Sequence, residues 1–564
     1  MTSRPASPST SVRELETLIT GAVVWTGDPE QPSAEAVGWS GDRITFVGRL
    51  ADASGLIGAR TRVIDGSGRM LLPGFIDDHQ HLFFGSAELD NLLVDGLHSF
   101  TELQFAIRSY AAEHPGKPCV SVSHLQYDAL PPGGPLTRQQ LDELVSDRPL
   151  VLMDYSYHTV WANSLALERA GLLHGGTSGP GSLIVMAPGG TASGELREPD
   201  AFGPVLALTG AWGRATRAYT HGASLPGDAA QRAEDLQIIR RGLSNAARLG
   251  ITSIQNMDGD RYQLDLLAQL EQEGALTARV SLPFMVRPDT PQGSLQEAVL
   301  WSNTYTGDRL RTGRLKLFMD GIIESHTALM LEDYADLPGS RGGALFGAEQ
   351  FAQIAVHADA LGLQLDVHAI GDGAVRRTLD GYSRARDVNG ARDSRHRIEH
   401  VEMLDPADLH RFAELGVTAS MQPGHVPGAG LVPLEAWTAA VPRERWGWAF
   451  PWRALRESGA RLAFGSDWPI IDANPLLGLR AALTRPLWNE DLPDQRPTLD
   501  QALAAFTSGG AYAEFMEEEK GTLRVGMLAD LVLLSHDLKT TPPQAYGEVK
   551  ALLTVCGGEV VYEA

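Results

Sequence analysis

Eight short apolar runs recur through the middle of this 564-residue chain, and several of them end in a polar side chain before a segment of helical periodicity begins. An apolar run of this length followed by an amphipathic helix is typical of a buried parallel strand. Eight such strand–helix units predict an α/β fold of the TIM (β/α)8 barrel class. The expected strands are residues 72–79, 251–256, 278–284, 315–319, 363–368, 397–401, 417–421 and 461–466.

The helices between these strands are indicated by the spacing of their apolar residues. In residues 348–361 one apolar stripe is expected, and Gly362 follows as a stop signal before the next strand. The stripe consists of Phe351, Ile354, Ala355, Ala358 and Leu361. The same pattern occurs at residues 233–249, which Gly250 ends.

Sequence composition outside the strand–helix units divides the chain further. Residues 1–13 are rich in Ser, Thr and Pro and are expected to form a disordered tail. Residues 14–72 and 518–564 are both β-rich, and we expect them to form one small, discontinuous β-sandwich domain. The barrel is expected over residues 73–517, with residues 83–230 as an inserted subdomain that covers its mouth.

Charge and cysteine content exclude several classes of partner. The formal net charge is −23 at pH 7, so we expect no binding to nucleic acid or to anionic membrane surfaces. Only Cys119 and Cys556 occur, which is typical of a cytoplasmic protein rather than a disulfide scaffold. No run reaches the roughly 20 apolar residues of a membrane span. We expect a cytoplasmic protein that acts on a small molecule, and the sequence leaves a homodimer open.

Metal-ligand side chains gather at the expected strand ends. His79 and His81 are two residues apart, so in a strand they point to the same face and can chelate one ion. The carboxyl ends of barrel strands converge on one pocket, where imidazole and carboxylate groups suit zinc and related catalytic ions. The other candidates at these ends are Lys316, His368, His400 and Asp467.

The strings that carry these residues resemble the amidohydrolase superfamily, and within it the branch that contains the N-substituted formamide deformylases. The resemblance covers nearly the whole chain. The matching strings are residues 73–81, 316–321, 366–374, 397–400, 465–469 and 526–531.

This resemblance implies a binuclear centre with two divalent ions, most often Zn²⁺. His79, His81 and Asp467 would hold one ion, His368 and His400 would hold the other, and a carboxylated Lys316 would bridge the two ions. Carboxylation of Lys316 is also chemically reasonable. An unmodified lysine ammonium would repel a divalent cation, whereas the lysine carbamate is an anion that can bridge two cations. A hydroxide shared by the ions would be the nucleophile, and Asp467 would carry its proton to the leaving nitrogen.

Four further residues are candidates for substrate contact. His158 and His425 stand where relatives carry a histidine, and each could instead hydrogen-bond to a ligand residue. Trp161 belongs to a group of aromatic residues near the expected mouth, which favours an apolar or aromatic substrate. Glu324 lies in residues 321–328, where the chain departs from many relatives. Arg397 is expected to be a structural ion partner for a nearby carboxylate.

Together these residues predict a metal-dependent hydrolase of a carbon–nitrogen bond, acting on an N-substituted amide or formamide with an apolar or aromatic substituent. The alternatives within enzymes are hydrolysis of a lactone, carbamate or cyclic amide, or a non-hydrolytic metal-dependent reaction, because this barrel hosts many chemistries. A non-catalytic scaffold protein of the same fold should have lost metal ligands, and none is lost here.

Overall fold

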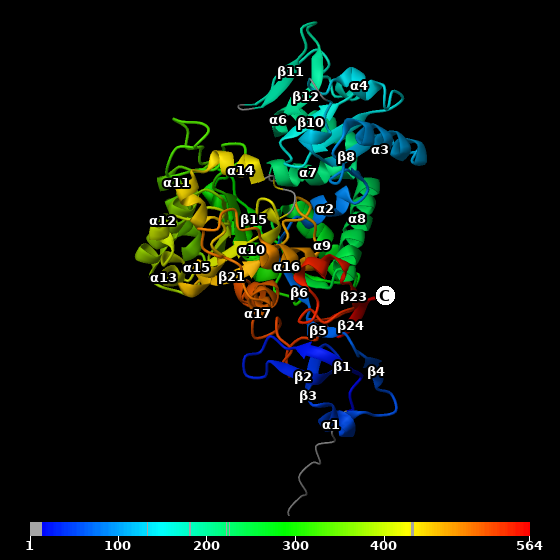
Figure 1. Cartoon of the computed structure of the whole chain (residues 1–564), viewed down its shortest axis with the longest axis vertical. Coiled ribbons are helices and arrows are strands. Elements are labelled where there is room, and N and C mark those ends of the chain that lie inside the picture. Colours follow the sequence, from blue (N-terminus) through cyan, green and yellow to red (C-terminus); the bar gives the residue numbers. More distant parts are fainter. Residues whose placement is uncertain are drawn as a thin grey trace, which may run out of the picture.

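The computed structural model describes residues 14–131, 134–179, 182–221, 223–224, 226–429, 432 and 434–564. The expected tail, residues 1–13, lies outside the described residues. Three parts follow one another along the long axis (Figure 1): a sheet made from both chain ends, a central body of parallel strands and helices, and the elements within residues 82–221, which we call the insertion. Among the described residues, no helix has the length and apolar character needed to cross a lipid bilayer.

Both ends of the chain contribute to one eight-stranded sheet, in the order β24-β23-β22-β5-β1-β2-β3 with β4 beside β1. Strand β5 pairs antiparallel with β22, and this pairing joins the two ends. Gly557 and Gly558 both have positive φ and connect β23 to β24, as a two-residue hairpin turn requires. The elements are β1 (Thr17–Trp25), β2 (Ser33–Ser40), β3 (Arg43–Gly48), α1 (Leu50–Ala53), β4 (Arg62–Asp65), β5 (Met70–Pro73), β22 (Leu531–Leu534), β23 (Ala551–Cys556) and β24 (Glu559–Glu563).

The central body contains a strand in each of the eight expected runs. They form two parallel sheets, β16-β14-β13-β6 and β15-β17-β18-β19-β20-β21. At the junction of β6 with β21, the His81 amide donates to the Trp468 carbonyl (2.8 Å) and Gln80 bridges Trp468. The strands are β6 (Phe75–Gln80), β13 (Ile251–Asn256), β14 (Arg279–Ser281), β15 (Phe284–Met285), β16 (Leu310–Arg311), β17 (Arg314–Phe318), β18 (Gln364–Ala369), β19 (Arg397–His400), β20 (Thr418–Met421) and β21 (Arg461–Phe464).

Helices of the central body alternate with these strands and cover them (Figure 1). Four residues of the expected stripe are buried in helix α11, whereas the fifth, Leu361, is half-buried just after the helix, and Gly362 with φ +78° follows it. The parallel α/β architecture predicted from the sequence is therefore present. The helices are α8 (Ala229–Arg248), α9 (Arg261–Gln272), α10 (Leu295–Thr304), α11 (Ala348–Ala360), α12 (Asp372–Asn389), α13 (Arg411–Leu415), α14 (Leu434–Ala440), α15 (Trp452–Glu457), α16 (Pro475–Thr484), α17 (Leu499–Ala504) and α18 (Gly510–Ala513).

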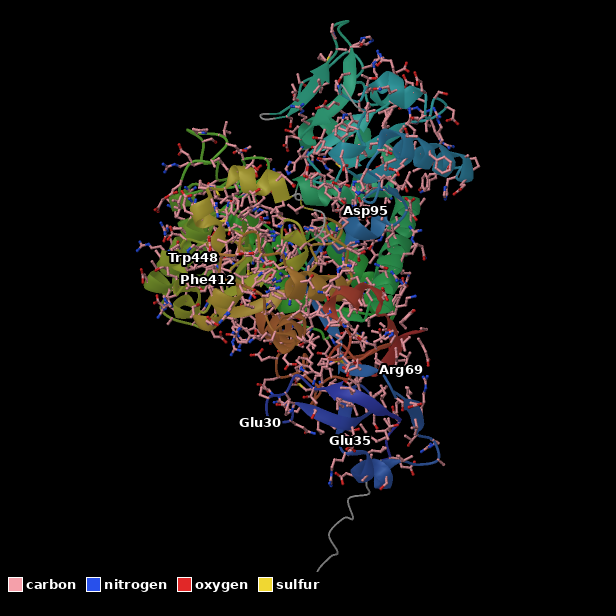
Figure 2. The ribbon with its side chains drawn as sticks, viewed as in Figure 1. Glu30, Glu35, Arg69, Asp95, Phe412 and Trp448 are labelled. Atoms are coloured by element: carbon pink, nitrogen blue, oxygen red, sulfur yellow. The ribbon has the colours of Figure 1, made fainter. Side chains whose placement is uncertain are left out.

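The insertion has a six-stranded sheet of its own, in the order β11-β12-β10-β9-β8-β7. A separate apolar cluster that includes Val122, Leu152 and Trp161 packs under it. Asp95 lies where the insertion meets the central body (Figure 2). Its elements are α2 (Leu82–Glu88), β7 (Leu92–Leu93), α3 (Phe100–Glu113), β8 (Val120–Leu125), α4 (Arg138–Asp142), β9 (Leu150–Asp154), β10 (Thr159–Ala162), α5 (Ser164–Arg169), β11 (Leu183–Met186), β12 (Ala192–Arg197), α6 (Pro199–Leu206) and α7 (Ala211–His221).

Candidate metal centre

All six residues predicted as metal ligands are buried, and all except Lys316, which lies in the middle of its strand, come from the carboxyl ends of parallel strands or the residues just after them. This placement follows from the parallel pairing, which brings the ends of neighbouring strands to the same edge. His79 lies on β6, with His81 directly after it, and Lys316 lies on β17. His368 lies on β18, His400 ends β19, and Asp467 follows β21.

Asp467 lies at the centre of the site. Its Oδ1 is 3.2 Å from His79 Nε2 and 3.1 Å from His81 Nε2. Its Oδ2 is 3.0 Å from His425 Nε2. His79, His400 and Asp467 offer ligand atoms that all lie within 4.8 Å of one another. Side chains from three separate strand ends thus converge on one point.

Carboxylates behind His79 and His81 fix which ring nitrogen faces Asp467. Nδ1 of His79 donates to Glu399 (2.5 Å), and Nδ1 of His81 donates to Asp258 (2.9 Å). A neutral imidazole held in this way presents its Nε2 lone pair, so two acceptors would face the acceptor Oδ1 of Asp467. A positive charge between the two Nε2 atoms and Oδ1 of Asp467 would remove the repulsion between these acceptors. Carboxylate–histidine pairs of this kind orient the ligands of bound metals.

The raised pKa of His81 also indicates that positive charge is favoured at this position. Burial alone would lower it, but the hydrogen bonds to Asp258 and Asp467 raise the pKa of His81 to about 9. A metal ion that binds an imidazole displaces this proton. The donor set therefore fits a divalent cation.

His368 and His400 form the second pair of imidazoles, with ring centroids 4.4 Å apart. Burial, together with the nearby Lys316, lowers the pKa of His368 to about 3, and burial with neighbouring histidines holds the pKa of His400 well below its usual value. Both rings are therefore neutral, as metal ligands must be. His400 Nδ1 is buried without a hydrogen-bond partner in the described part of the chain. This unpartnered nitrogen is chemically suited to bind a cation.

Lys316 is fully buried on β17. Its Nζ lies 3.6 Å from Met257 Sδ and 4.0 Å from Asp366 Oδ1. Burial lowers the pKa of Lys316. A buried amine with a lowered pKa is more often neutral, and only the neutral amine can react with CO₂ to form a carbamate.

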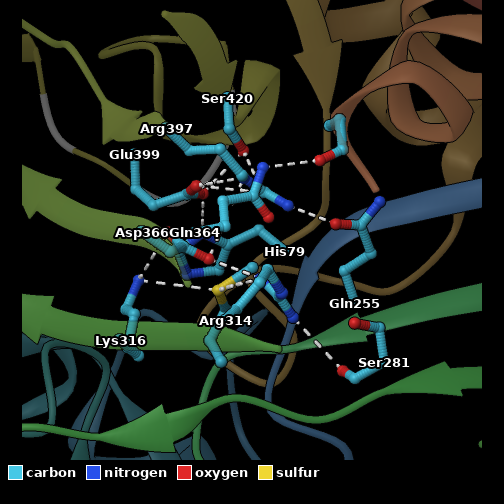
Figure 3. Close-up of polar contacts among 12 residues, drawn as sticks. His79, Gln255, Ser281, Arg314, Lys316, Gln364, Asp366, Arg397, Glu399 and Ser420 are labelled. Atoms are coloured by element: carbon cyan, nitrogen blue, oxygen red, sulfur yellow. Dashed lines mark hydrogen bonds and ion pairs between the residues drawn. The ribbon is translucent and has the colours of Figure 1, made fainter. Parts of the chain in front are cut away.

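Arg397 connects this centre to the core of the central body (Figure 3). It is completely buried and donates to Glu399 (3.0 Å), Asp78 (2.9 Å) and Ser420 (3.0 Å). Glu399 in turn accepts from His79. The structure therefore places Arg397 as an ion partner of buried carboxylates, in agreement with the sequence analysis.

Two ligand positions have unusual backbone conformations. His400 has φ +74° and Asp467 has φ +63°. Non-glycine residues seldom adopt the left-handed region, and such conformations concentrate at functional sites. At both positions the chain turns sharply as the strand ends, which directs the side chain into the pocket.

A cavity of about 90 Å³ opens over these residues. His158, Glu324 and His425, three of the candidates for substrate contact, line it, and Tyr155 and Phe318 add apolar surface. His158 Nδ1 donates to Glu198 (3.1 Å). Trp161 does not reach this cavity. It is 3 % exposed and packs in the apolar cluster of the insertion, because β10 directs it into that core.

Several residues of the site were not assigned from the sequence. Glu402 lines the cavity, and burial together with Glu324 and Asp320 raises its pKa well above the usual value. Asp320 accepts from the amides of Ile370 (3.0 Å) and Gly371 (2.9 Å) and so ties β17 to the segment after β18. Asp320 and Glu399 lie within recognisable strings, whereas Asp258 and Glu402 carry no local signal.

A family model described as the amidohydrolase family matches residues 62–562. The chain belongs to this family. Over 92% of its length it is 30% identical to Protein LONG AFTER FAR-RED 3 of Arabidopsis thaliana, of which the match covers 87%. It is 27% identical to the N-substituted formamide deformylase of Arthrobacter pascens, with 98% of this chain and 99% of that protein covered.

A solved structure, an uncharacterized metal-dependent hydrolase from Pyrococcus furiosus, is similar over 92% of this amidohydrolase and 99% of that chain. The two are 26% identical, with a TM-score of 0.71. Family membership and this structural likeness identify the protein as an enzyme, a hydrolase acting on carbon–nitrogen bonds.

Proposed function

We propose that this amidohydrolase cleaves the amide bond of an N-substituted amide or formamide that carries an apolar or aromatic substituent. The likeness to the N-substituted formamide deformylase along nearly the whole chain supports this substrate class. Tyr155, Phe318 and Ile470 form an apolar wall beside the candidate metal ligands. Such a wall favours an uncharged substituent over a charged one.

One observation carries the proposal. Asp467 lies against the imidazoles of His79 and His81, and the Nδ1 atoms of both rings are hydrogen-bonded to carboxylates. We assign His79, His81 and Asp467 to one divalent ion and His368 and His400 to a second, with carboxylated Lys316 between them. Zinc suits a set of imidazoles and a carboxylate without thiolates.

Bound divalent ions supply an activated water and polarise the amide carbonyl. The residues of the chain then carry the proton. Asp467 accepts it from the attacking water and returns it to the leaving nitrogen, the usual task of a positioned carboxylate. His425, 3.0 Å from Asp467 Oδ2, orients the carboxylate, and the partners Glu399 and Asp258 hold His79 and His81 in place.

We also propose that the central body is a closed barrel and that the protein is cytoplasmic. The bridge between Gln80 and Trp468 and the adjacency of β14 and β15 along the chain support closure of the two parallel sheets into a (β/α)8 barrel. We propose the domain bounds expected from the sequence: residues 14–72 and 518–564 for the small β domain, and residues 73–517 for the barrel. Cys119 and Cys556 are buried and free, which supports a cytoplasmic protein. Gel filtration, which measures the size of the protein in solution, would show whether it forms a homodimer.

A turnover screen of the zinc-loaded protein tests the function. The panel pairs N-substituted formamides with the matching acetamides, carbamates, lactones and cyclic amides. We expect the formamides and simple amides to be hydrolysed fastest, with release of the free amine. Preferred hydrolysis of lactones or carbamates would replace the proposed substrate class.

Metal content is the first quantitative prediction. By ligand count we expect about two divalent ions per chain after loading. Removal by a chelator should reduce turnover to background, and added zinc should restore it. Elemental analysis alongside activity measures both effects. Full activity with one ion or none would contradict the binuclear centre.

Lys316→Ala should lower the metal content and the turnover while the fold remains, because Asp366 keeps its ion pair with Arg314. Short carboxylates added to the buffer could take the place of the missing carbamate and should restore part of the activity. Elemental analysis and circular dichroism report the two effects. Exposed Lys539 provides the control, and Lys539→Ala should behave as wild type. Wild-type turnover of Lys316→Ala without additive would contradict the bridging role.

A further inference from the structure

The cavity over the metal-ligand residues is too small to hold a whole substituted amide. Its volume is about 90 Å³, whereas sites for drug-sized ligands usually measure roughly 300–1,000 Å³. An amide group fits there, but a large substituent on its nitrogen must extend into neighbouring space. Two further cavities share lining residues with this one.

The first neighbour, which we call the Phe346 cavity, has a volume of about 270 Å³. It shares two lining residues, His158 and Phe318, with the metal-ligand cavity. The second, which we call the Glu88 cavity, has a volume of about 370 Å³ and shares only Ile471. Together with either neighbour, the metal-ligand cavity reaches the lower end of the usual range for ligand sites.

The Phe346 cavity is lined mainly by apolar side chains. Met285 and Val286 follow one another at β15, Phe318 ends β17, and Leu345 and Phe346 come from the loop before α11. Pro199 closes it from the insertion. Val286 and Phe346 are buried, so their surfaces already form part of an apolar core. Glu198, Arg287 and Asp320 also line this cavity. Glu198 accepts from His158 Nδ1, and Asp320 accepts from the Ile370 and Gly371 amides, so both carboxylates keep polar partners when an apolar group displaces water.

His158 stands at the boundary between this cavity and the metal-ligand cavity. Its ring is fixed, because Nδ1 donates to both oxygens of Glu198 at 3.1 Å and the Glu198 amide donates to the His158 carbonyl (2.9 Å). Phe318, at the end of β17, also lines both cavities. The two side chains therefore lie between the amide position and the apolar space.

The Glu88 cavity has a different chemistry. Glu88, Asp95, Arg248 and Asp472 line it, and Asp95 lies where the insertion meets the central body (Figure 2). An apolar substituent would remove water from these charges at a cost in free energy. Ser466 also lines it, and its amide (2.8 Å) and hydroxyl (2.6 Å) both donate to buried Asp77.

We propose that the Phe346 cavity binds the apolar substituent on the substrate nitrogen, an aralkyl or branched alkyl group, while the amide lies over the metal-ligand residues. The inference rests on the proposed function for the identity of the amide. It adds a place for the rest of the substrate and names His158 and Phe318 as the residues that position it. Affinity should rise about three- to fourfold per buried methylene along a series of N-alkyl formamides.

A pair of leucines allows a matched test. Leu345 lines the Phe346 cavity and is 56% exposed, whereas Leu89 lines the Glu88 cavity and is 39% exposed. Both positions tolerate a larger side chain without overpacking a core. Leu345→Trp narrows the first cavity and Leu89→Trp narrows the second. To measure binding independently of turnover, each protein also carries Asp467→Asn, which is expected to keep the metal and lose hydrolysis. The zinc-loaded full chain is then titrated calorimetrically with N-(2-phenylethyl)formamide and with N-methylformamide.

We expect Leu345→Trp to weaken binding of N-(2-phenylethyl)formamide at least tenfold and to leave N-methylformamide within twofold. Leu89→Trp should change neither ligand by more than twofold. Met285→Trp serves as a second variant if Leu345→Trp does not fold, as judged by circular dichroism. The ratio of kcat/KM for the two formamides, measured with Asp467 intact, should change in the same direction as the binding constants.

Three results would overturn the inference. One is a larger loss for Leu89→Trp than for Leu345→Trp, which would assign the substituent to the Glu88 cavity. Another is an equal loss for both ligands in Leu345→Trp. The third is a wild-type protein that does not bind the phenylethyl compound more tightly than the methyl one. The expected binding pattern without hydrolysis of either formamide when Asp467 is intact would contradict the proposed function and leave the binding cavity in place.

Discussion

Asp467→Asn is expected to lower turnover by about two orders of magnitude or more, the usual scale of a general acid–base contribution. Burial alone would raise the pKa of Asp467, but His79, His81 and His425 hold it well below its usual value, so the group is a carboxylate at neutral pH. Asparagine keeps the size and one oxygen donor of the side chain. It cannot accept a proton from water, so metal can remain bound while turnover is lost.

The measurement combines kcat over a pH range with elemental analysis. The acidic limb of the wild-type pH–rate profile should disappear in Asp467→Asn. Asp472 lies five residues further along the same segment and is exposed, so Asp472→Asn should keep nearly all activity. If Asp467→Asn retained more than half of the wild-type turnover, proton transfer would have to be assigned to His425 or His158.

The elements of the central body could be predicted because their signals are local. Alternating or continuous apolar runs marked the eight parallel strands of three or more residues in the central body. Gly362 marked the end of α11 because only glycine adopts a positive φ there without strain. The same logic places His79 and His81 on one face. Parallel pairing then brings the strand ends together, so the predicted ligands meet in one pocket without any contact being known in advance.

The partners of those ligands could not be predicted, because they depend on pairings between distant segments. Asp258 reaches His81 from a position 177 residues away, and Glu399 reaches His79 from 320 residues away. Trp161 was expected near the barrel mouth, yet the insertion forms a six-stranded sheet that buries Trp161 in its own core. An aromatic residue alone does not reveal which of two cores it joins.

Replacement of Arg397 is expected to have the second large effect, on stability. Arg397 neutralises buried carboxylates that are shielded from water. Its guanidinium donates to Asp78 and Glu399, and its Nε lies 3.9 Å from Asp366. Removing one partner of a buried ion pair costs about 3–5 kcal/mol, since the remaining charge is left uncompensated. We expect Arg397→Met to lower the free energy of unfolding by at least this amount, with loss of metal binding as Glu399 no longer holds His79.

Urea denaturation followed by circular dichroism compares Arg397→Met with a matched surface variant. Arg49 pairs with Asp52 at 2.9 Å, and both side chains are more than half exposed, so the pair is well solvated. Exposed pairs of this kind contribute about 0–1 kcal/mol, and Arg49→Met should therefore unfold at nearly the wild-type urea concentration. Arg397→Lys keeps the charge but loses the planar fork that reaches two carboxylates, so its midpoint should fall between the two. Equal midpoints for Arg397→Met and Arg49→Met would show that the buried carboxylates are neutral in the folded protein, and that Glu399 does not need Arg397 to orient His79.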